Sequence, residues 1–249
     1  MKTCSSRLSL LIAGVSLACI ASVLPQKQFQ EDAIRTSAGE LKITCIGHGT
    51  LMFTYGGKVI HVDPLSAYAD YSKLPKADVI LVTHEHGDHL DAKAIQALST
   101  EKTAVVVSQS CAKALPSAII MTNGATQTVS GFRIDAVPAY NIVNTTRSGV
   151  PYHPKGNGNG YVVTFGDKRV YVAGDTENIP EMKELKQIDV AFLPMNLPFT
   201  MTPEMVADAA RAFRPKILYP YHFGATDTAV LVNLLKEEKG IEVRIRELR

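Results

Sequence analysis

Short runs of apolar and β-branched residues recur along the chain and are separated by Gly, Pro and Asp, a pattern that predicts strands joined by turns. Three early runs predict a meander with Gly56-Gly57 as its hairpin turn. These runs span residues 41–46, 51–55 and 58–62. Residues 77–83 are more uniformly apolar, which is typical of an inner strand.

A strand–helix–strand unit follows this meander. Asp91 is suited to cap a helix that runs to about Leu98, and residues 103–108 predict the next strand. The second half of the chain repeats the pattern. Its predicted strands span residues 127–130, 132–137, 161–165, 169–173, 190–193 and 217–221.

Two further helices are expected in the second half. Thr202-Pro203 begins the first, and Asp227 caps the second, which should stop at Gly240. Their inward faces are formed by Met205, Ala209 and Phe213 and by Leu231, Leu234 and Leu235. Residues 241–248 alternate between apolar and polar and predict a closing strand.

This order of elements predicts an α/β fold in which two sheets pack face to face with helices outside them. No linker divides the sequence, so we expect a single domain. Residues 141–160 form the longest irregular segment, which is too long for a plain connection and is therefore expected to be functional.

The composition, 46% hydrophobic and 20% charged over 249 residues, is that of a globular chain with a sizeable core. An uncharged apolar run over residues 8–24 follows Lys2 and Arg7, which is typical of a secretory signal. The chain is therefore expected to comprise a signal peptide at 1–22, a flexible N-terminal stretch at 23–39 and the folded domain at 40–249.

The charge balance bears on location and partners. Removing Lys2 and Arg7 with the signal leaves equal numbers of basic and acidic residues. A neutral domain lacks the attraction that nucleic acids and acidic membranes exert on basic proteins. We expect an exported protein, periplasmic or secreted, with no integral membrane span after cleavage and no nucleic-acid partner.

Four cysteines allow two further interpretations. Cys4 and Cys19 lie within the predicted signal, and lipid anchoring through Cys19 is an alternative to simple cleavage. Cys45 and Cys111 remain in the mature chain, where a disulfide between them is allowed but not implied.

A dense group of potential metal ligands follows the predicted inner strand. His84, His86, Asp88 and His89 lie within the six residues HEHGDH. Alternation along an extended segment places the first three on one side, whereas Gly87 lets the chain bend so that His89 points elsewhere. Two neighbouring metals could be served, and these nitrogen and oxygen donors suit zinc, iron or manganese.

The HEHGDH segment resembles the HxHxDH signature of the metallo-β-lactamase superfamily, and the similarity spans essentially the whole chain after the signal. The resemblance implies a four-layer αββα sandwich. It also implies further ligands from later loops, for which His153, Asp175 and His222 occur in the right order, within YHPKGNGNG, VAGDT and YPYHFG.

The resemblance implies two metal ions that share one carboxylate. The first ion would be held by His84, His86 and His153, the second by Asp88, His89 and His222, with Asp175 bridging the two. The expected cofactors are therefore two divalent ions, with zinc the expected metal and manganese or iron the alternatives.

Six more residues are candidates for supporting the ligands or contacting substrate: His48, Asp63, Tyr140, Asn141, Tyr152 and Asn196. For His48, a site role and a plain turn role are both open. Asp63 is expected to orient a ligand loop, unless Asp63-Pro64 only forms a turn. The Tyr and Asn residues are loop residues that would ring the metals, although such residues often only form turns. His61 lies inside a predicted strand and is expected to be packed in the core.

A pair of divalent cations about 3.5–4 Å apart lowers the pKa of a shared water toward about 7, which makes a hydroxide nucleophile available near neutral pH. Asp88 and Asp175 are the expected catalytic residues, steering this water and accepting its proton. The sequence therefore predicts a metal-dependent hydrolase of an ester, lactone or phosphodiester.

AVPAYN and HPKGNGNGY resemble a bacterial branch of the superfamily that is similar to ascorbate-phosphate lactonases and N-acylphosphatidylethanolamine phospholipase D. This resemblance implies a small phosphorylated or lipid-like substrate. Two alternatives are an iron-dependent oxidoreductase on the same fold and a non-catalytic exported metal-binding protein. Diiron relatives usually carry Glu at the second motif histidine, where this chain keeps His86.

Overall fold

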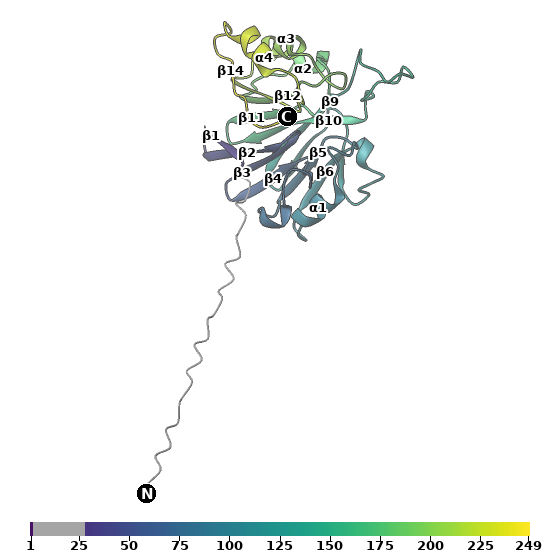
Figure 1. The fold of residues 1–249 in the computed structure, drawn as a ribbon. Helices are drawn as coiled ribbons and strands as arrows, with labels where there is room; N and C mark the ends of the chain where they lie inside the picture. The colour runs from purple at the N-terminus through teal and green to yellow at the C-terminus, as the bar shows by residue number, and fades with distance from the viewer. Residues whose placement is uncertain (2–27) are drawn as a thin grey trace.

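Two seven-stranded sheets face each other in the computed structural model of this chain, which describes Met1 and residues 28–249 (Figure 1). Each sheet begins with antiparallel strands and ends with parallel ones. The predicted two-sheet sandwich with outer helices is therefore confirmed.

The first sheet contains the strands of the N-terminal half in chain order. Its strands are β1 Gln30–Thr36, β2 Gly39–Gly47, β3 Thr50–Tyr55, β4 Lys58–Val62, β5 Val79–Val82, β6 Ala104–Ser108 and β7 Ile119–Met121. β4, β5, β6 and β7 are parallel, so the loops after β4 and β5 leave the same edge of the sheet.

The second sheet repeats this arrangement in the order β14-β13-β12-β11-β10-β9-β8. Its strands are β8 Thr126–Val129, β9 Phe132–Ala139, β10 Gly158–Phe165, β11 Lys168–Val172, β12 Val190–Pro194, β13 Ile217–Tyr221 and β14 Glu242–Val243. Phe53 of β3 packs against Phe165 and Phe192, with ring centroids 5.6 and 6.2 Å apart, so aromatic side chains fill the space between the sheets.

Helices cover the outer face of each sheet (Figure 1). The α-helices are α1 Ala92–Leu98, α2 Pro180–Lys183, α3 Pro203–Phe213 and α4 Thr228–Leu235, and the 3₁₀ helices are η1 Tyr71–Lys73 and η2 Gln109–Cys111. Asp91, Thr202 and Asp227 cap α1, α3 and α4 with side-chain hydrogen bonds, as predicted. Ile95 and Leu98 of α1 pack in one apolar cluster, and Phe213 of α3 packs in the core between the sheets and α3.

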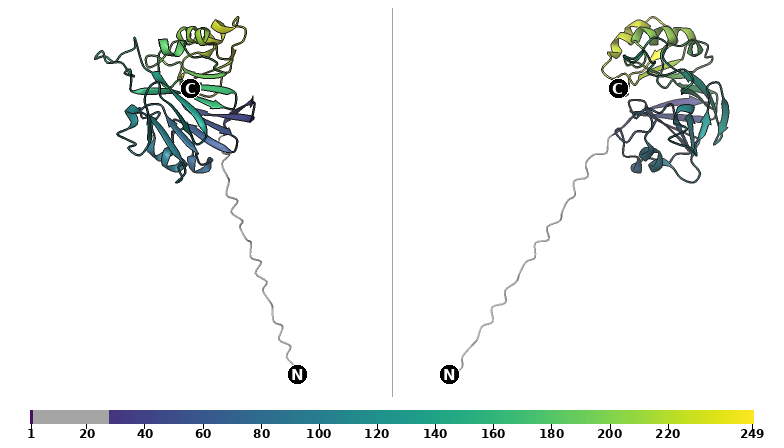
Figure 2. Two further views of the ribbon diagram at one scale, coloured as in Figure 1. Left: turned by 180° about the vertical axis from the view of Figure 1, so that it is seen from behind. Right: turned by 90° about the vertical axis from the view of Figure 1, so that its right-hand side faces the viewer.

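Residues 140–157, which we call the arm, connect β9 to β10 and project from the body of the molecule (Figures 1 and 2). Within the arm, Thr145 and Pro151 form an isolated antiparallel β-bridge. The expectation of a long irregular segment here is confirmed, although β10 begins at Gly158 rather than at Tyr161.

Three sequence-based expectations need correction. The flexible stretch predicted for 23–39 is wrong for Gln30–Thr36, which pairs with β2 over its full length. The last helix ends at Leu235 and continues as turns, so Gly240 is not its direct stop. The strand predicted for 241–248 is reduced to Glu242–Val243.

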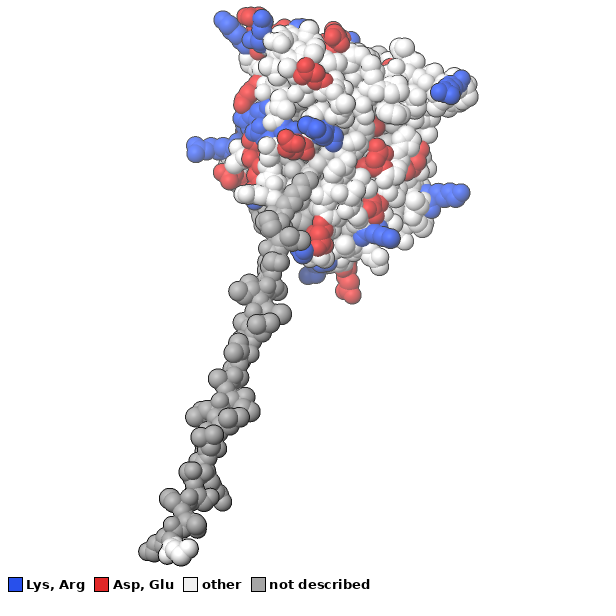
Figure 3. All heavy atoms as spheres, in the orientation of Figure 1, with Lys and Arg blue, Asp and Glu red and all other residues white. Residues whose placement is uncertain are grey.

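The signal predicted at 1–22 and the alternative lipid anchor at Cys19 lie outside the described residues, apart from Met1. Among the residues that the structure describes, no helix is long and apolar enough to cross a membrane. Cys45 and Cys111 are buried free thiols, and burial raises the pKa of each, to about 12 and about 11. On the face drawn in Figure 3, basic and acidic side chains of the described residues are interspersed.

Candidate metal centre

The HEHGDH segment links the end of a buried strand to the start of a helix. All four residues of β5 are buried, and Asp91 then caps α1 by accepting from the backbone N–H groups of Lys93 and Ala94. Between them, the backbone N–H groups of His89 and Leu90 both donate to the carbonyl of His86. This tight turn lets neighbouring ligands in the sequence point in different directions.

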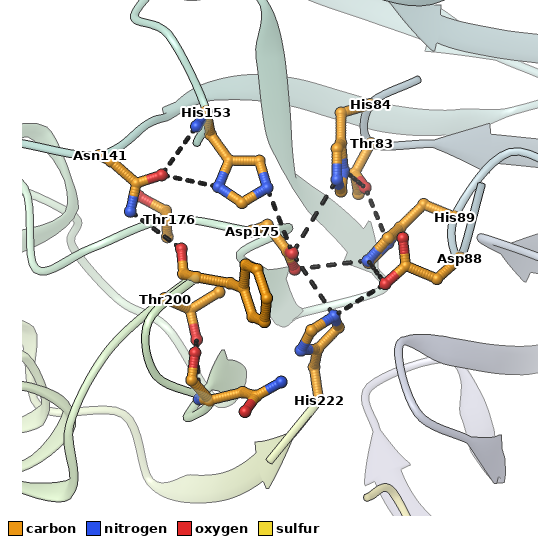
Figure 4. A network of polar contacts seen from close by, with 12 residues as sticks. Thr83, His84, Asp88, His89, Asn141, His153, Asp175, Thr176, Thr200 and His222 are labelled. Carbon is orange, nitrogen blue, oxygen red and sulfur yellow. Dashed lines mark hydrogen bonds and ion pairs between the residues drawn. The ribbon is translucent and has the colours of Figure 1, made fainter. Parts of the chain in front are cut away.

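The remaining predicted ligands come from three loops of the second sheet. His153 lies in the arm, Asp175 follows β11 and Gly174, and His222 follows β13 with a φ of 47°. The structure brings all of them to the HEHGDH segment, and Figure 4 shows His84, His89, His153 and His222 arranged around Asp175. Strand ends far apart in the sequence thus meet at one edge of the sandwich.

Three overlapping groups of residues each bring their donor atoms together, so that within a group these atoms all lie within 4.8 Å of one another. They are His84, His86 and His153; His48, Asp88, His89 and His222; and His84, His89 and Asp175. The first group coincides with the ligand set that the family resemblance implies for one ion. The second contains the set implied for the other ion and adds His48.

Asp175 lies between the two groups. Its carboxylate is 3.4 Å from Nε2 of His89, 3.4 Å from Nε2 of His153 and 3.4 Å from Nε2 of His222, and 3.9 Å from Nε2 of His84. The side chain is buried, whereas that of Asp88 is 47% exposed. Asp88 therefore lies on the open side of the centre and Asp175 on the closed side.

The unpartnered atoms of this cluster fit a metal site. Nε2 of His84, His89, His153 and His222 and Oδ1 of Asp175 are buried without a hydrogen-bond partner among the described residues. Buried polar atoms are normally satisfied, so several orphaned atoms pointing to one place fit the binding of a cation there. Imidazole nitrogens and carboxylate oxygens are the donors that zinc and similar divalent metals accept.

Hydrogen bonds from outside the cluster orient two of these rings. Thr83 Oγ1 donates its proton to Asp63 Oδ2 at 2.7 Å, so at 3.0 Å it can only accept from Nδ1 of His84. His89 donates from Nδ1 to the same Asp63 oxygen at 2.8 Å. When these rings are neutral, Nε2 keeps its lone pair for a metal.

The electrostatics of the metal-free cluster follow from burial and crowding. Burial lowers the pKa of His84 well below its usual value, and the neighbouring His89 lowers it further. Burial opposes charge on His89 too, but the carboxylates of Asp175 and Asp63 outweigh it and raise the pKa of His89 to about 9. The pKa of Asp175 lies well below its usual value because charges on His222 and His89 outweigh the effect of its own burial.

The six additional candidates differ in how close they come to the ligands. Asp63 bonds His89, Asn141 bonds His153, and His48 Nε2 lies 3.3 Å from Asp88 Oδ2. The other three do not bond a ligand in the described part of the chain.

Tyr152 lines a pocket together with His84, His86, His153 and Asp175. The hydroxyl of Tyr140 donates to Glu181 rather than to a candidate ligand. Asn196 borders the loop after His222, since a Cβ on Gly224 would lie 3.2 Å from its Oδ1.

Two residues near the ligands were not expected. The hydroxyl of Thr83 donates a hydrogen bond to Asp63 and accepts one from His84. Glu177 accepts a hydrogen bond from Asn141. Thr83 could have been suspected because it immediately precedes the motif at a strand end. Glu177 stands two residues after Asp175, but nothing in its own sequence context marks it.

The fold and this cluster define a class of protein. Residues 42–222 match the sequence profile of the beta-lactamase superfamily domain. The chain therefore belongs to the β-lactamase superfamily, which confirms the family that HEHGDH indicated.

Within this superfamily the chain belongs to the UPF0173 metal-dependent hydrolases. It is 30% identical over 223 residues to such a protein from Pelotomaculum thermopropionicum, covering 82% of this chain and 96% of the relative. A crystal structure of a protein from Parabacteroides distasonis, assigned as a metal-dependent hydrolase, is 53% identical with a TM-score of 0.85. That similarity covers 89% of this chain and all of the other.

A more distant solved structure shows how widely the fold is used. CmlA, a diiron β-hydroxylase from Streptomyces venezuelae, has a TM-score of 0.66 at 17% identity, over 84% of this chain and 53% of CmlA. At this identity the similarity concerns the fold alone.

Proposed function

We propose that this protein is a hydrolase of an ester, lactone or phosphodiester. It would use two divalent metal ions, with zinc the preferred metal over manganese or iron. The observation that carries the proposal is the convergence of orphaned, buried Nε2 atoms on Asp175 from two ligand groups. A single cation would leave one of these groups without a partner.

The chain's own side chains would divide the work between the two ions. His84, His86 and His153 would hold one, and Asp88, His89 and His222 the other, while Asp175 reaches both groups. When bound, such a pair of cations lowers the pKa of a shared water and polarises the substrate oxygen. Asp63, Thr83 and Asn141 keep the rings aimed at the centre.

Asp88 is the carboxylate best placed to handle protons. Its side chain is half exposed and lies 3.4 Å from Nε2 of His222 and 3.3 Å from Nε2 of His48, and these imidazoles hold its pKa well below the usual value despite partial burial. A carboxylate on the open side of the centre can orient an incoming water and accept its proton. Asp175 is enclosed by imidazoles, which suits it to bridging.

Support for a small or lipid-like substrate comes from the arm. Tyr152, from the arm, borders the pocket beside His84, His86 and His153, and its ring packs edge-on against Phe199 with centroids 5.0 Å apart. Ile142 and Val143 in the arm, and Leu197 two residues before Phe199, expose more than half of their surface. An ester with an apolar substituent is therefore a suitable first class to assay.

The test is a panel of phosphodiesters, lactones, thioesters, simple esters and β-lactams, run with protein loaded separately with zinc, manganese or iron. We expect turnover of at least one ester, lactone or phosphodiester that is lost on chelation and regained on metal addition. His86→Gln should abolish it, whereas His61→Gln, which removes a buried histidine elsewhere, should not. Hydrolysis that survives complete metal removal would overturn the mechanism.

Two other outcomes would favour the alternatives. Stoichiometric iron together with oxygen consumption would support an oxidoreductase. Tight metal binding without turnover of any compound would support a non-catalytic metal-binding protein.

A further inference from the structure

Glu177 occupies a cradle made only of hydrogen-bond donors. The residue is 1% exposed, and its two carboxylate oxygens accept four hydrogen bonds of 2.6 to 3.1 Å. The donors are the backbone N–H groups of Ile142, Val143 and Asn144 and the side-chain amide of Asn141. A buried carboxylate is tolerated only when it is satisfied in this way, so the cradle fixes Glu177 and the base of the arm against each other.

The amide of Asn141 has one orientation that its neighbours allow. Its Nδ2 donates to Glu177 Oε1 at 3.1 Å and to the carbonyl of Phe199 at 2.9 Å, and both of these partners only accept. Its Oδ1 accepts from the backbone N–H of His153 at 2.8 Å, which only donates. Exchanging the nitrogen and oxygen would set donor against donor and acceptor against acceptor.

This orientation determines which nitrogen of His153 carries the proton. Nδ1 of His153 lies 2.7 Å from Asn141 Oδ1, which can only accept. In the neutral ring Nδ1 must therefore carry the hydrogen, and Nε2 keeps its lone pair. That Nε2 is the atom that lies 3.4 Å from Asp175.

We propose that Glu177 is a positioning residue of the metal centre: through Asn141 it holds His153 in the tautomer and orientation that present Nε2 to the cation. Among the described residues, Glu177 forms no hydrogen bond with a candidate ligand, and Asn141 is the side chain that links its carboxylate to His153. The proposal rests on the proposed function in one respect, that His153 is a metal ligand.

The experiment compares wild type with Glu177→Gln. Nitrogen NMR of ¹⁵N-histidine-labelled, metal-free protein reads the tautomer of His153, and chelator competition reads metal affinity. We expect the proton on Nδ1 in wild type and a loss of this preference in the variant, because the new amide puts a donor against the cradle's donors. Metal affinity should fall about 10–100-fold.

Glu181→Gln is the matched control, since this carboxylate accepts from Tyr140 and Lys155 without contacting Asn141. It should leave both readouts unchanged. The proposal is overturned if Glu177→Gln keeps the wild-type tautomer and metal affinity, or if the wild-type ring carries its proton on Nε2.

Should Glu177→Gln fail to fold, Asn141→Leu keeps the three backbone donors of the cradle and removes the amide that bonds Glu177, Phe199 and His153. The proposal requires the same loss of the Nδ1 proton, and retention overturns it. Because the tautomer is measured on metal-free protein, its result can contradict the positioning role of Glu177 without contradicting the proposed function, and the reverse also holds. Wild type that shows the expected tautomer but binds no metal overturns the proposed function and leaves the orienting chain of hydrogen bonds established.

Discussion

The imidazole rings of His48 and His222 lie 3.8 Å apart between centroids, and the backbone N–H of His222 donates to the carbonyl of His48 at 3.2 Å. His48 stands in the turn between β2 and β3 and His222 follows β13, so this pair joins the two sheets beside the metal centre. Both residues have a positive φ, of 53° and 47°, a conformation that costs about 1–3 kcal/mol and is characteristic of functional sites. His48 therefore lies in a turn and also against a candidate ligand, and a site role for it stays a prediction.

His48 and His222 should respond differently to substitution. On the proposed function, His222→Gln should lower the metal stoichiometry from two to one, because a candidate ligand of the second ion is lost. His48→Gln should keep two ions at saturation but weaken the second about 10–100-fold, because Asp88 loses a supporting contact. Metal titration followed by elemental analysis measures both. A stoichiometry of one in His48→Gln would show that His48 is itself a ligand.

Asp63→Asn tests the carboxylate behind His84 and His89. Asp63 accepts from the backbone N–H and hydroxyl of Thr83 and from His89, so either orientation of the amide leaves a buried donor facing a donor. We expect a loss of about 1–3 kcal/mol in the free energy of unfolding and about 10–100-fold weaker metal binding. Asp78→Asn, which affects a carboxylate bonded to the backbone of β4, should leave metal binding unchanged. Wild-type metal affinity in Asp63→Asn would contradict this role.

Local patterns in the sequence account for most of the fold, and the exceptions have physical causes. The strand Gln30–Thr36 carries Glu31, Asp32 and Arg35 because it is an edge strand, where charged side chains are favoured and apolar alternation is weak. The alternation of residues 241–248 has another origin. Arg246 pairs with Asp32 of β1 at 2.6 Å. A polar position of this segment therefore forms an ion pair with β1 rather than taking part in strand pairing.

The position of the candidate site could be predicted to the extent that its candidate ligands stand at the ends of strands. His84, Asp175 and His222 each stand just beyond a strand that apolar runs had marked, and matching order with the motif completed the set. Glu177 could not be found in this way. Its partners are mostly backbone N–H groups of the arm, and backbone donors leave no trace in the residue types of a sequence.

Gly174→Ala should disturb Asp175. Gly174 has a φ of 67°, and a Cβ there would lie 2.8 Å from the carbonyl oxygen of Asn159 and 3.1 Å from Cβ of Thr83. Gly56→Ala is the matched control, because Gly56 has a φ of 56° with nothing within 4 Å of a Cβ. In both variants the left-handed backbone conformation should lower the free energy of unfolding by about 1–2 kcal/mol. Only Gly174→Ala should lower it further, because of the close contacts, and bind metal more weakly. Equal losses of unfolding free energy and unchanged metal binding in both would refute this.

His61 should make the stability of the metal-free protein depend on pH. This ring is fully buried beside Tyr71 and Pro75, and burial lowers its pKa to about 4 although the carbonyl of Pro75 accepts from it. Above about pH 6.5 the ring is neutral in both the folded and the unfolded state, and its contribution is fully present. As the pH falls from 6.5 to 4, only the unfolded state gains the proton, so about 3 kcal/mol of unfolding free energy is lost.

His61→Gln isolates this effect, because every other titrating group remains in both proteins. Wild type should be the more stable protein at pH 7, since it keeps the ring's contacts with Tyr71 and Pro75. Its advantage should shrink between pH 6.5 and 4, where the substituted protein has a shallower pH dependence. Urea unfolding at several pH values measures the difference. A difference that stays constant over this range would mean that His61 takes up its proton equally in the folded and unfolded states, and that burial does not hold it neutral.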